Sequence, residues 1–164
     1  MATQDMLTKI EEAMADNILA MKEGSYFFSW GSVNEPDQAK QEFPSAEIML
    51  DNEECLDENG GAWNGAYQNR AYFDITVKAR LQNETVSGQQ VYAINEELNK
   101  ALSDLKKCFG IHYDLDLCTV IMYRGTRRVT EPQGDLLVPK RMIVSFSVDY
   151  MQGREDPTTG ADGA

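Results

Sequence analysis

The chain has 164 residues, a net charge of −12 and 42% hydrophobic residues, which fits one globular domain with a single core. No apolar stretch approaches the roughly 20 residues that span a bilayer. The first residues lack the basic and apolar regions of a signal peptide, so we expect synthesis in the cytoplasm and no membrane contact. The acidic balance argues against binding to nucleic-acid phosphates, which requires a basic surface.

The acidic residues are concentrated in the first part of the chain. Residues 1–68 carry 14 acids and 3 bases, whereas residues 69–151 carry 10 acids and 11 bases. Two interpretations follow. The charge serves solubility alone, or an acidic face of one copy meets a less acidic face of another.

The N-terminal part predicts one helix, two strands and a long loop. Apolar residues recur every three or four positions over residues 3–23, which is typical of an amphipathic helix ending before Gly24. The aromatic-rich run 26–33 predicts a strand, and residues 45–50 predict a second. Acids, asparagines and glycines over residues 51–68 indicate a long loop.

The middle of the chain carries the clearest patterns. Apolar and polar residues alternate over Ala71–Leu81, which predicts a half-buried strand that is long against a mode of roughly 5–6 residues. Ser87 and Gln90 fit a capping box, in which each side chain accepts a hydrogen bond from the backbone of the other residue. They predict the start of a helix over residues 87–109, which Gly110 is expected to end.

The last part of the chain predicts two strands, 118–124 and 137–151, separated by a basic arm over residues 124–134. Residues 152–164 are polar and glycine-rich and are predicted to form a tail outside a single domain of residues 1–151. The strands follow one another without a helix between each pair. The order of elements therefore predicts an α+β fold with a mostly antiparallel sheet and two helices packed on one face.

A search for chemistry predicts no catalytic residue, metal site or cofactor. The three cysteines are widely spaced and suggest neither a disulfide framework nor zinc binding. His112, the only histidine, lies outside any catalytic motif. Asp114 and Asp116 would share a face of an extended strand, where a solvated strand edge is the alternative to acid–base chemistry. The acidic run 51–61 does not fit a calcium loop.

Four residues are candidates for contact with another subunit or a partner. Arg124, Arg127 and Arg128 form the most basic part of the chain. They either lie on a solvated hairpin tip or reach the acidic half of an adjacent copy, because a guanidinium pairs bidentately with carboxylates. Trp63 lies in a glycine-rich segment that lacks the signature of a phosphate loop. It is expected either to fold back over the core or to dock on a neighbour.

The layout resembles the tail terminator proteins of long-tailed bacteriophages and related tail-completion and head–tail joining proteins. The resemblance rests on the helix 3–23, the long strand Ala71–Leu81, the helix from Ser87 to Phe109, and the last strand Ile143–Tyr150 leading into Glu155-Asp156-Pro157. It covers residues 1–157 as a pattern of elements rather than as a motif.

The resemblance implies a non-enzymatic virion protein that forms a ring, usually hexameric, at the junction of tail and neck. Such a ring caps the tail tube, ends its polymerisation and binds the neck or head-completion protein, while genomic DNA passes through without specific binding. An acidic surface would repel DNA in the lumen or meet a partner. Its candidate residues are Asp51, Glu53, Glu54, Asp57 and Glu58. The alternatives are a neck or head-completion adaptor, a small enzyme or ligand-binding domain, and a cellular domain unrelated to phages.

Overall fold

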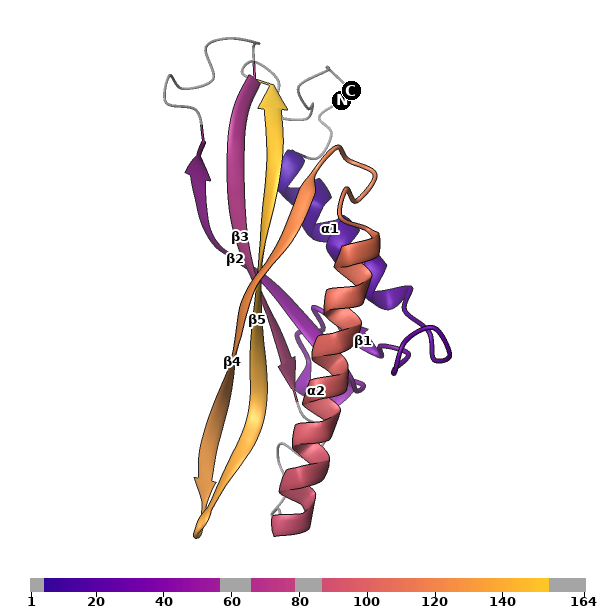
Figure 1. Cartoon of the computed structure of the whole chain (residues 1–164), viewed down its shortest axis with the longest axis vertical. Coiled ribbons are helices and arrows are strands. Elements are labelled where there is room, and N and C mark those ends of the chain that lie inside the picture. The colour runs from indigo at the N-terminus through magenta and orange to yellow at the C-terminus, as the bar shows by residue number, and fades with distance from the viewer. Residues whose placement is uncertain (1–4, 57–65, 79–86, 154–164) are drawn as a thin grey trace.

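The computed structural model describes residues 5–56, 66–78 and 87–153. These residues form two helices, a short 3-10 helix and one five-stranded sheet of order β1-β2-β3-β5-β4 (Figure 1). The bounds are α1 (Met6–Leu19), β1 (Ser32–Val33), η1 (Gln38–Lys40), β2 (Ser45–Cys55), β3 (Ala66–Lys78), α2 (Gly88–Ile111), β4 (Val120–Gln133) and β5 (Leu136–Gly153). Every pair of neighbouring strands is antiparallel except β1 and β2. The predicted α+β fold is confirmed.

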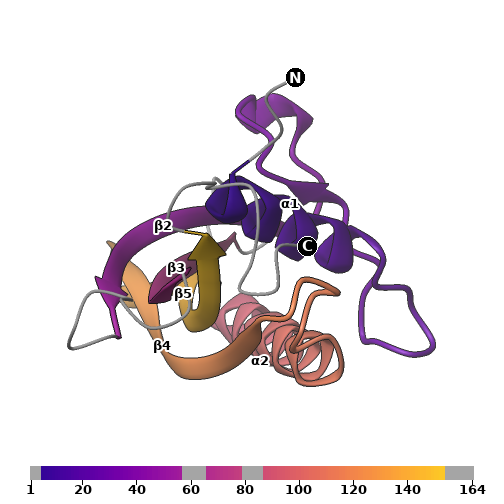
Figure 2. The ribbon, with the colours of Figure 1, turned by 90° about the horizontal axis from the view of Figure 1, so that it is seen from above.

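Both helices lie inside the curve of the sheet, on the same face (Figure 2). Strand β3 alternates buried and half-buried residues, as the sequence pattern predicts. Its buried residue Phe73 pairs in register with Phe146 of β5, and the Phe146 ring packs edge-on against Phe109 of α2 at 5.1 Å between centroids. The core therefore fills the space between the two helices and one side of the sheet.

Side chains cap the starts of both helices. Asp5 accepts a hydrogen bond from the backbone N–H of Thr8 at 2.9 Å, and this bond holds the pKa of Asp5 below its ordinary value. At α2, Ser87 and Gln90 form the predicted capping box. The predicted ends were wrong. Helix α2 continues through Gly110 to Ile111, and α1 stops at Leu19 because the next residues tighten into a turn that buries Met21.

The predicted strand over residues 26–33 was largely wrong, because only Ser32 and Val33 belong to a strand. The cause is the buried carboxylate of Asp104 on α2. It accepts hydrogen bonds from the backbone N–H groups of Phe27 and Phe28, at 2.8 and 3.0 Å, and from the indole N–H of Trp30 at 3.3 Å. The Asp104 carboxylate thus accepts hydrogen bonds from backbone N–H groups that would otherwise bond a partner strand. Trp30 is buried in the core.

The predicted loop over residues 51–68 was also wrong at both ends. Strand β2 continues to Cys55 and β3 begins at Ala66, and the two remain paired as far as Cys55 and Asn69. The polar residues of this extension bond across the strands, as where the Tyr72 hydroxyl donates to Glu54 at 2.9 Å. Residues 57–65 and 79–86 lie outside the described residues.

The predicted basic arm, residues 124–134, is a continuation of β4 rather than a loop. Strands β4 and β5 pair along their whole length to Gln133 and Leu136, and the chain turns at Gly134, whose φ of 59° suits glycine. The far half of this hairpin extends past the rest of the sheet (Figure 1). At its other end β5 reaches Gly153, so the first two residues of the predicted tail belong to the sheet. The remainder, residues 154–164, lies outside the described residues.

Candidate assembly surface

The three arginines of β4 have different surroundings. Arg128 points toward α2, where it donates to the side-chain oxygens of Asn95, at 2.9 Å, and of Asn99. Arg124 donates from Nε to the hydroxyl of Ser147 at 2.7 Å. Arg127 is exposed and forms no hydrogen bond or ion pair with any described residue. Arg128 therefore braces the hairpin against its own helix, while Arg127 is available to another molecule.

The acidic residues of β2 do not form one surface, because successive residues of a strand project to opposite faces. Glu53 accepts a hydrogen bond from the Tyr150 hydroxyl at 2.8 Å, on the side of the helices. Burial and this acceptor raise the pKa of Tyr150 above its ordinary value. Glu54 bonds Tyr72 on the other face.

Asp51 is exposed at the irregularity between Leu50 and Asn52. It forms no hydrogen bond or ion pair with the part of the chain that the structure describes. Asp57, Glu58 and Trp63 lie outside the described residues. Of the predicted acidic residues that are described, Asp51 is therefore the one whose side chain bonds no other described residue.

Strand β2 beyond its short pairing with β1, and strand β4 at the other end of the sheet, each have one side that is bonded near the start of the strand and lacks a partner strand further along, among the described residues. On β2, the N–H of Ile48 donates to the side chain of Asn34 at 2.7 Å. On β4, the N–H of Ile121 donates to the carbonyl of Tyr113 at 2.9 Å. Beyond these two bonds, no segment among the described residues pairs with the outer side of either strand.

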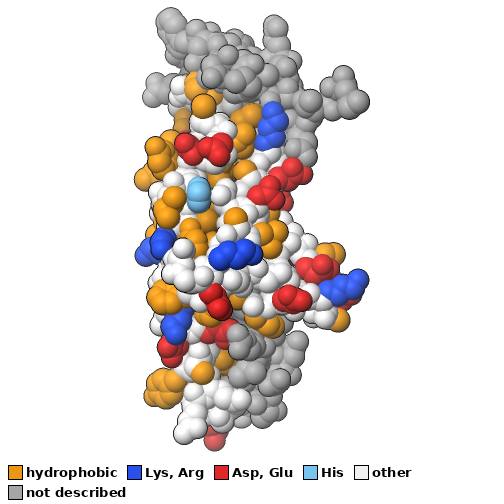
Figure 3. All heavy atoms as spheres, turned by 90° about the vertical axis from the view of Figure 1, so that its right-hand side faces the viewer, with side chains coloured by type: hydrophobic (Ala, Val, Ile, Leu, Met, Phe, Trp, Pro, Cys, Tyr) orange, Lys and Arg blue, Asp and Glu red, His pale blue; other side chains and the backbone are white. Residues whose placement is uncertain are grey.

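Exposed apolar side chains accompany these open edges. Met49 on β2 is 60% exposed, Met122 on β4 is 46% exposed, and Leu137 near the hairpin turn is 69% exposed. On the side of the molecule that bears the helices, hydrophobic side chains are interspersed with charged ones (Figure 3). Single exposed apolar residues are normal, but their presence on both strands that have one side without a partner strand is what an interface would need.

The polar side chains at the centre of the outer sheet face bond one another. Arg70 and Asp149 form an ion pair at 2.7 Å, which raises the pKa of the guanidinium, and the Ser145 hydroxyl donates to Asp74 at 2.7 Å. The centre of this face thus has little need of a partner. The groups that could bind a partner are along the sides of β2 and β4 that lack a partner strand.

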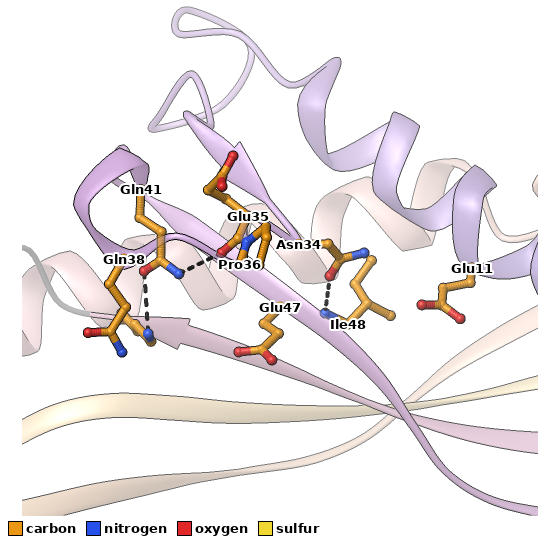
Figure 4. A pocket seen from close by; sticks show the side chains of 9 residues that line it. Glu11, Asn34, Glu35, Pro36, Gln38, Gln41, Glu47 and Ile48 are labelled. Carbon is orange, nitrogen blue, oxygen red and sulfur yellow. Dashed lines mark hydrogen bonds between the residues drawn. The ribbon is translucent and has the colours of Figure 1, made fainter.

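A shallow depression of about 420 Å³ lies beside the start of β2 (Figure 4). Its wall includes three carboxylates, Glu11, Glu35 and Glu47, and one lysine, Lys78, whose ammonium donates to the Gln41 side chain at 3.3 Å. No group of three potential metal ligands occurs among the described residues.

The remaining candidate residues for chemistry lie between α2 and β4. His112 is exposed and caps α2 through its backbone N–H, which donates to Cys108. Asp114 and Asp116 were expected on an extended edge, but they belong to a turn in which the Asp114 carboxylate accepts from the Asp116 N–H at 3.2 Å. The turn conformation, with positive φ at Asp116, prevents the two carboxylates from sharing a strand face.

No helix among the described residues is long and apolar enough to cross a membrane. No protein-family model matches the chain, and no curated protein matches it in sequence.

Proposed function

We propose that the chain is a structural virion protein, a subunit of a closed hexameric ring that caps a bacteriophage tail tube. The ring ends tube polymerisation and joins the tube to the neck of the head. The observation that carries this proposal is the projecting half of the β4–β5 hairpin. It extends past the other strands of the sheet, alongside the first half of α2, and its exposed side is a surface that a neighbouring part could cover (Figure 1).

The far half of the hairpin is two-stranded within the described residues, since β3 first meets β5 at Lys78 and Arg141. Its inner side packs on the core through Val138, which is fully buried, while Leu137 is exposed on the other side. Two-stranded ribbons are marginal in water unless one face is covered. The inner face of this ribbon is covered by its own core, and contact of the outer side with the tube or an adjoining ring would cover the exposed Leu137.

The charge of the chain agrees with a channel for DNA. A net charge of −12 disfavours adhesion to phosphates, so genomic DNA would pass through the ring without specific binding. Asp51 and the outward-facing Glu54 are the described acidic residues that remain candidates for the lumen or for a partner surface. The proposed location is the junction of tail and neck.

Native mass spectrometry of the purified chain, followed by electron microscopy of tail tubes polymerised with and without it, tests the proposal. We expect a closed ring, and tubes that stop growing when the ring is added. Leu137→Asp should weaken capping while leaving the ring intact. The matched control is Arg70→Lys, in the half-buried ion pair at the centre of the outer sheet face.

Two results would count against a tail terminator. Rings that bind heads but leave tube growth unchanged would favour a neck or head-completion adaptor. A chain that neither assembles nor binds tubes or heads would overturn a role in the virion.

A further inference from the structure

Two open strand edges of opposite charge lie on opposite sides of the sheet. Residues 49–54 of β2 contain Asp51, Glu53 and Glu54, and residues 124–129 of β4 contain Arg124, Arg127 and Arg128. We propose that residues 49–54 of one copy pair with residues 124–129 of the next copy, so that the sheet continues from subunit to subunit. This inference rests on the proposed ring and names the contact that builds it.

The strand directions permit such pairing. Strand β2 is antiparallel to β3, β3 to β5, and β5 to β4, so β2 and β4 run in opposite directions. Placing β4 of one copy beside β2 of the next therefore extends the alternating antiparallel order of the sheet. Addition of a strand to an open edge supplies backbone hydrogen bonds, and the side chains set the register.

One register matches the side chains of the two segments. If Asp51 lies opposite Arg127, then Glu54 lies opposite Arg124 and Met49 lies opposite Val129. Two acid–base pairs and one apolar pair result. Opposite charges on facing strand positions stabilise a pair of strands, whereas like charges destabilise it. The contact would also cover Met49, which is 60% exposed in the single chain.

The groups that would pair are available. Neither Asp51 nor Arg127 bonds any described residue. Arg124 uses Nε for Ser147, at 2.7 Å. Glu54 uses one oxygen, Oε1, for Tyr72. These bonds fix the side chains in place and leave the second carboxylate oxygen of Glu54 to accept a further hydrogen bond.

The charges also select how the copies meet. Pairing β2 with β2 of another copy would set acids beside acids, and pairing β4 with β4 would set arginines beside arginines. The favoured contact is therefore between different edges, a head-to-tail interface that repeats around an axis and can close into a ring.

Charge reversal with complementation tests the contact. Asp51→Arg and Arg127→Glu are each made alone, and both variants are checked for the wild-type melting curve, which they should retain because both side chains are exposed. In either variant every interface then carries like charges, and association should weaken roughly tenfold or more at each interface. Native mass spectrometry should therefore show each single variant as smaller species than the wild-type ring.

Mixing the two variants should restore assembly. When R127E and D51R copies alternate, each interface regains one acid and one base, so an equimolar mixture should give rings with an even number of subunits. Glu131→Arg, a reversal on β4 outside the paired segment, is the matched control and should leave the ring unchanged.

The possible failures are distinct. Intact rings from both single variants, or folded single variants whose mixture does not assemble, would overturn this pairing and leave the ring itself standing. A wild-type chain that stays monomeric at high concentration, with and without tube protein, would overturn both this contact and the proposed function.

Discussion

The buried carboxylate of Asp104 gives the sharpest prediction about stability. It is 2% exposed and accepts three hydrogen bonds from the segment between α1 and β1, two from backbone N–H groups and one from the indole of Trp30. This one side chain therefore holds an irregular segment of the chain against α2. Its replacement should loosen that segment and lower the free energy of unfolding.

The size of the effect can be worked from the bonds. In Asp104→Asn one oxygen remains, and it is best placed where it can still accept from Phe28 and Trp30. The new NH₂ group then faces the Phe27 N–H, so one hydrogen bond is lost, at a cost of about 1–3 kcal/mol. Asp104→Ala removes all three bonds and leaves their donors without this acceptor, which should cost about 3–5 kcal/mol.

Urea denaturation followed by circular dichroism and tryptophan fluorescence measures both variants. Glu96→Gln, on the same helix, is the control. Glu96 forms an exposed ion pair with Lys100 at 2.9 Å, so its replacement should change stability by less than about 1 kcal/mol. If Asp104→Ala were as stable as this control, or more stable than Asp104→Asn, the assigned role of the carboxylate would be refuted.

Three further predictions concern α2 and its neighbours. Arg128→Lys should destabilise the protein by about 1 kcal/mol and increase hydrogen exchange in the far half of the hairpin. The reason is that an ammonium cannot bond Asn95 and Asn99 in the same planar geometry. Unchanged hydrogen exchange would contradict this prediction. Burial raises the pKa of the Cys108 thiol to about 12, so brief iodoacetamide treatment at pH 8 should modify the exposed Cys55 and Cys118 but not Cys108, as read by mass spectrometry. The raised pKa of Cys108 also predicts that the protonated thiol contributes to the free energy of unfolding. This contribution should be complete below pH 9 and be lost as the pH rises toward 12, and the fall in stability over this range should be smaller in Cys108→Ala.

Elements whose signals are local could be predicted from the sequence. The alternation in Ala71–Leu81 predicted β3, and the Ser87–Gln90 capping box predicted where α2 begins. In both cases the residues that carry the signal make the structure by themselves, through one buried face or one pair of hydrogen bonds. The antiparallel fold class followed from the order of such elements.

Elements decided by distant partners could not be predicted. The aromatic run 26–33 has strand propensity, but Asp104, more than 70 positions away along the chain, binds its backbone instead. Asp104 interrupts the apolar stripe of α2 next to Leu105, and this was the one available signal of a buried acid. The sequence of the acidic end of β2 indicates a loop, and only its pairing with β3 in the structure shows that it is a strand.

The sequence indicated which charged residues to consider for contact, and their role in contact stays a prediction. It could not show where their side chains point. Arg124, Arg127 and Arg128 were expected to act together on an arm. Their placement on a strand sends Arg128 to α2 and leaves Arg127 outward, a division that depends on the bulges of β4. Spacing along the sequence cannot locate such bulges, so the division was not foreseeable.

The position of β5 in the sheet has a consequence for biosynthesis. This strand lies between β3 and β4, yet the ribosome makes it after every other described element. Until it emerges, β3 and β4 have no common neighbour and the five-stranded sheet cannot form. A nascent chain therefore cannot display its two outer edges in their final arrangement, which delays recognition between copies until translation of the domain is complete.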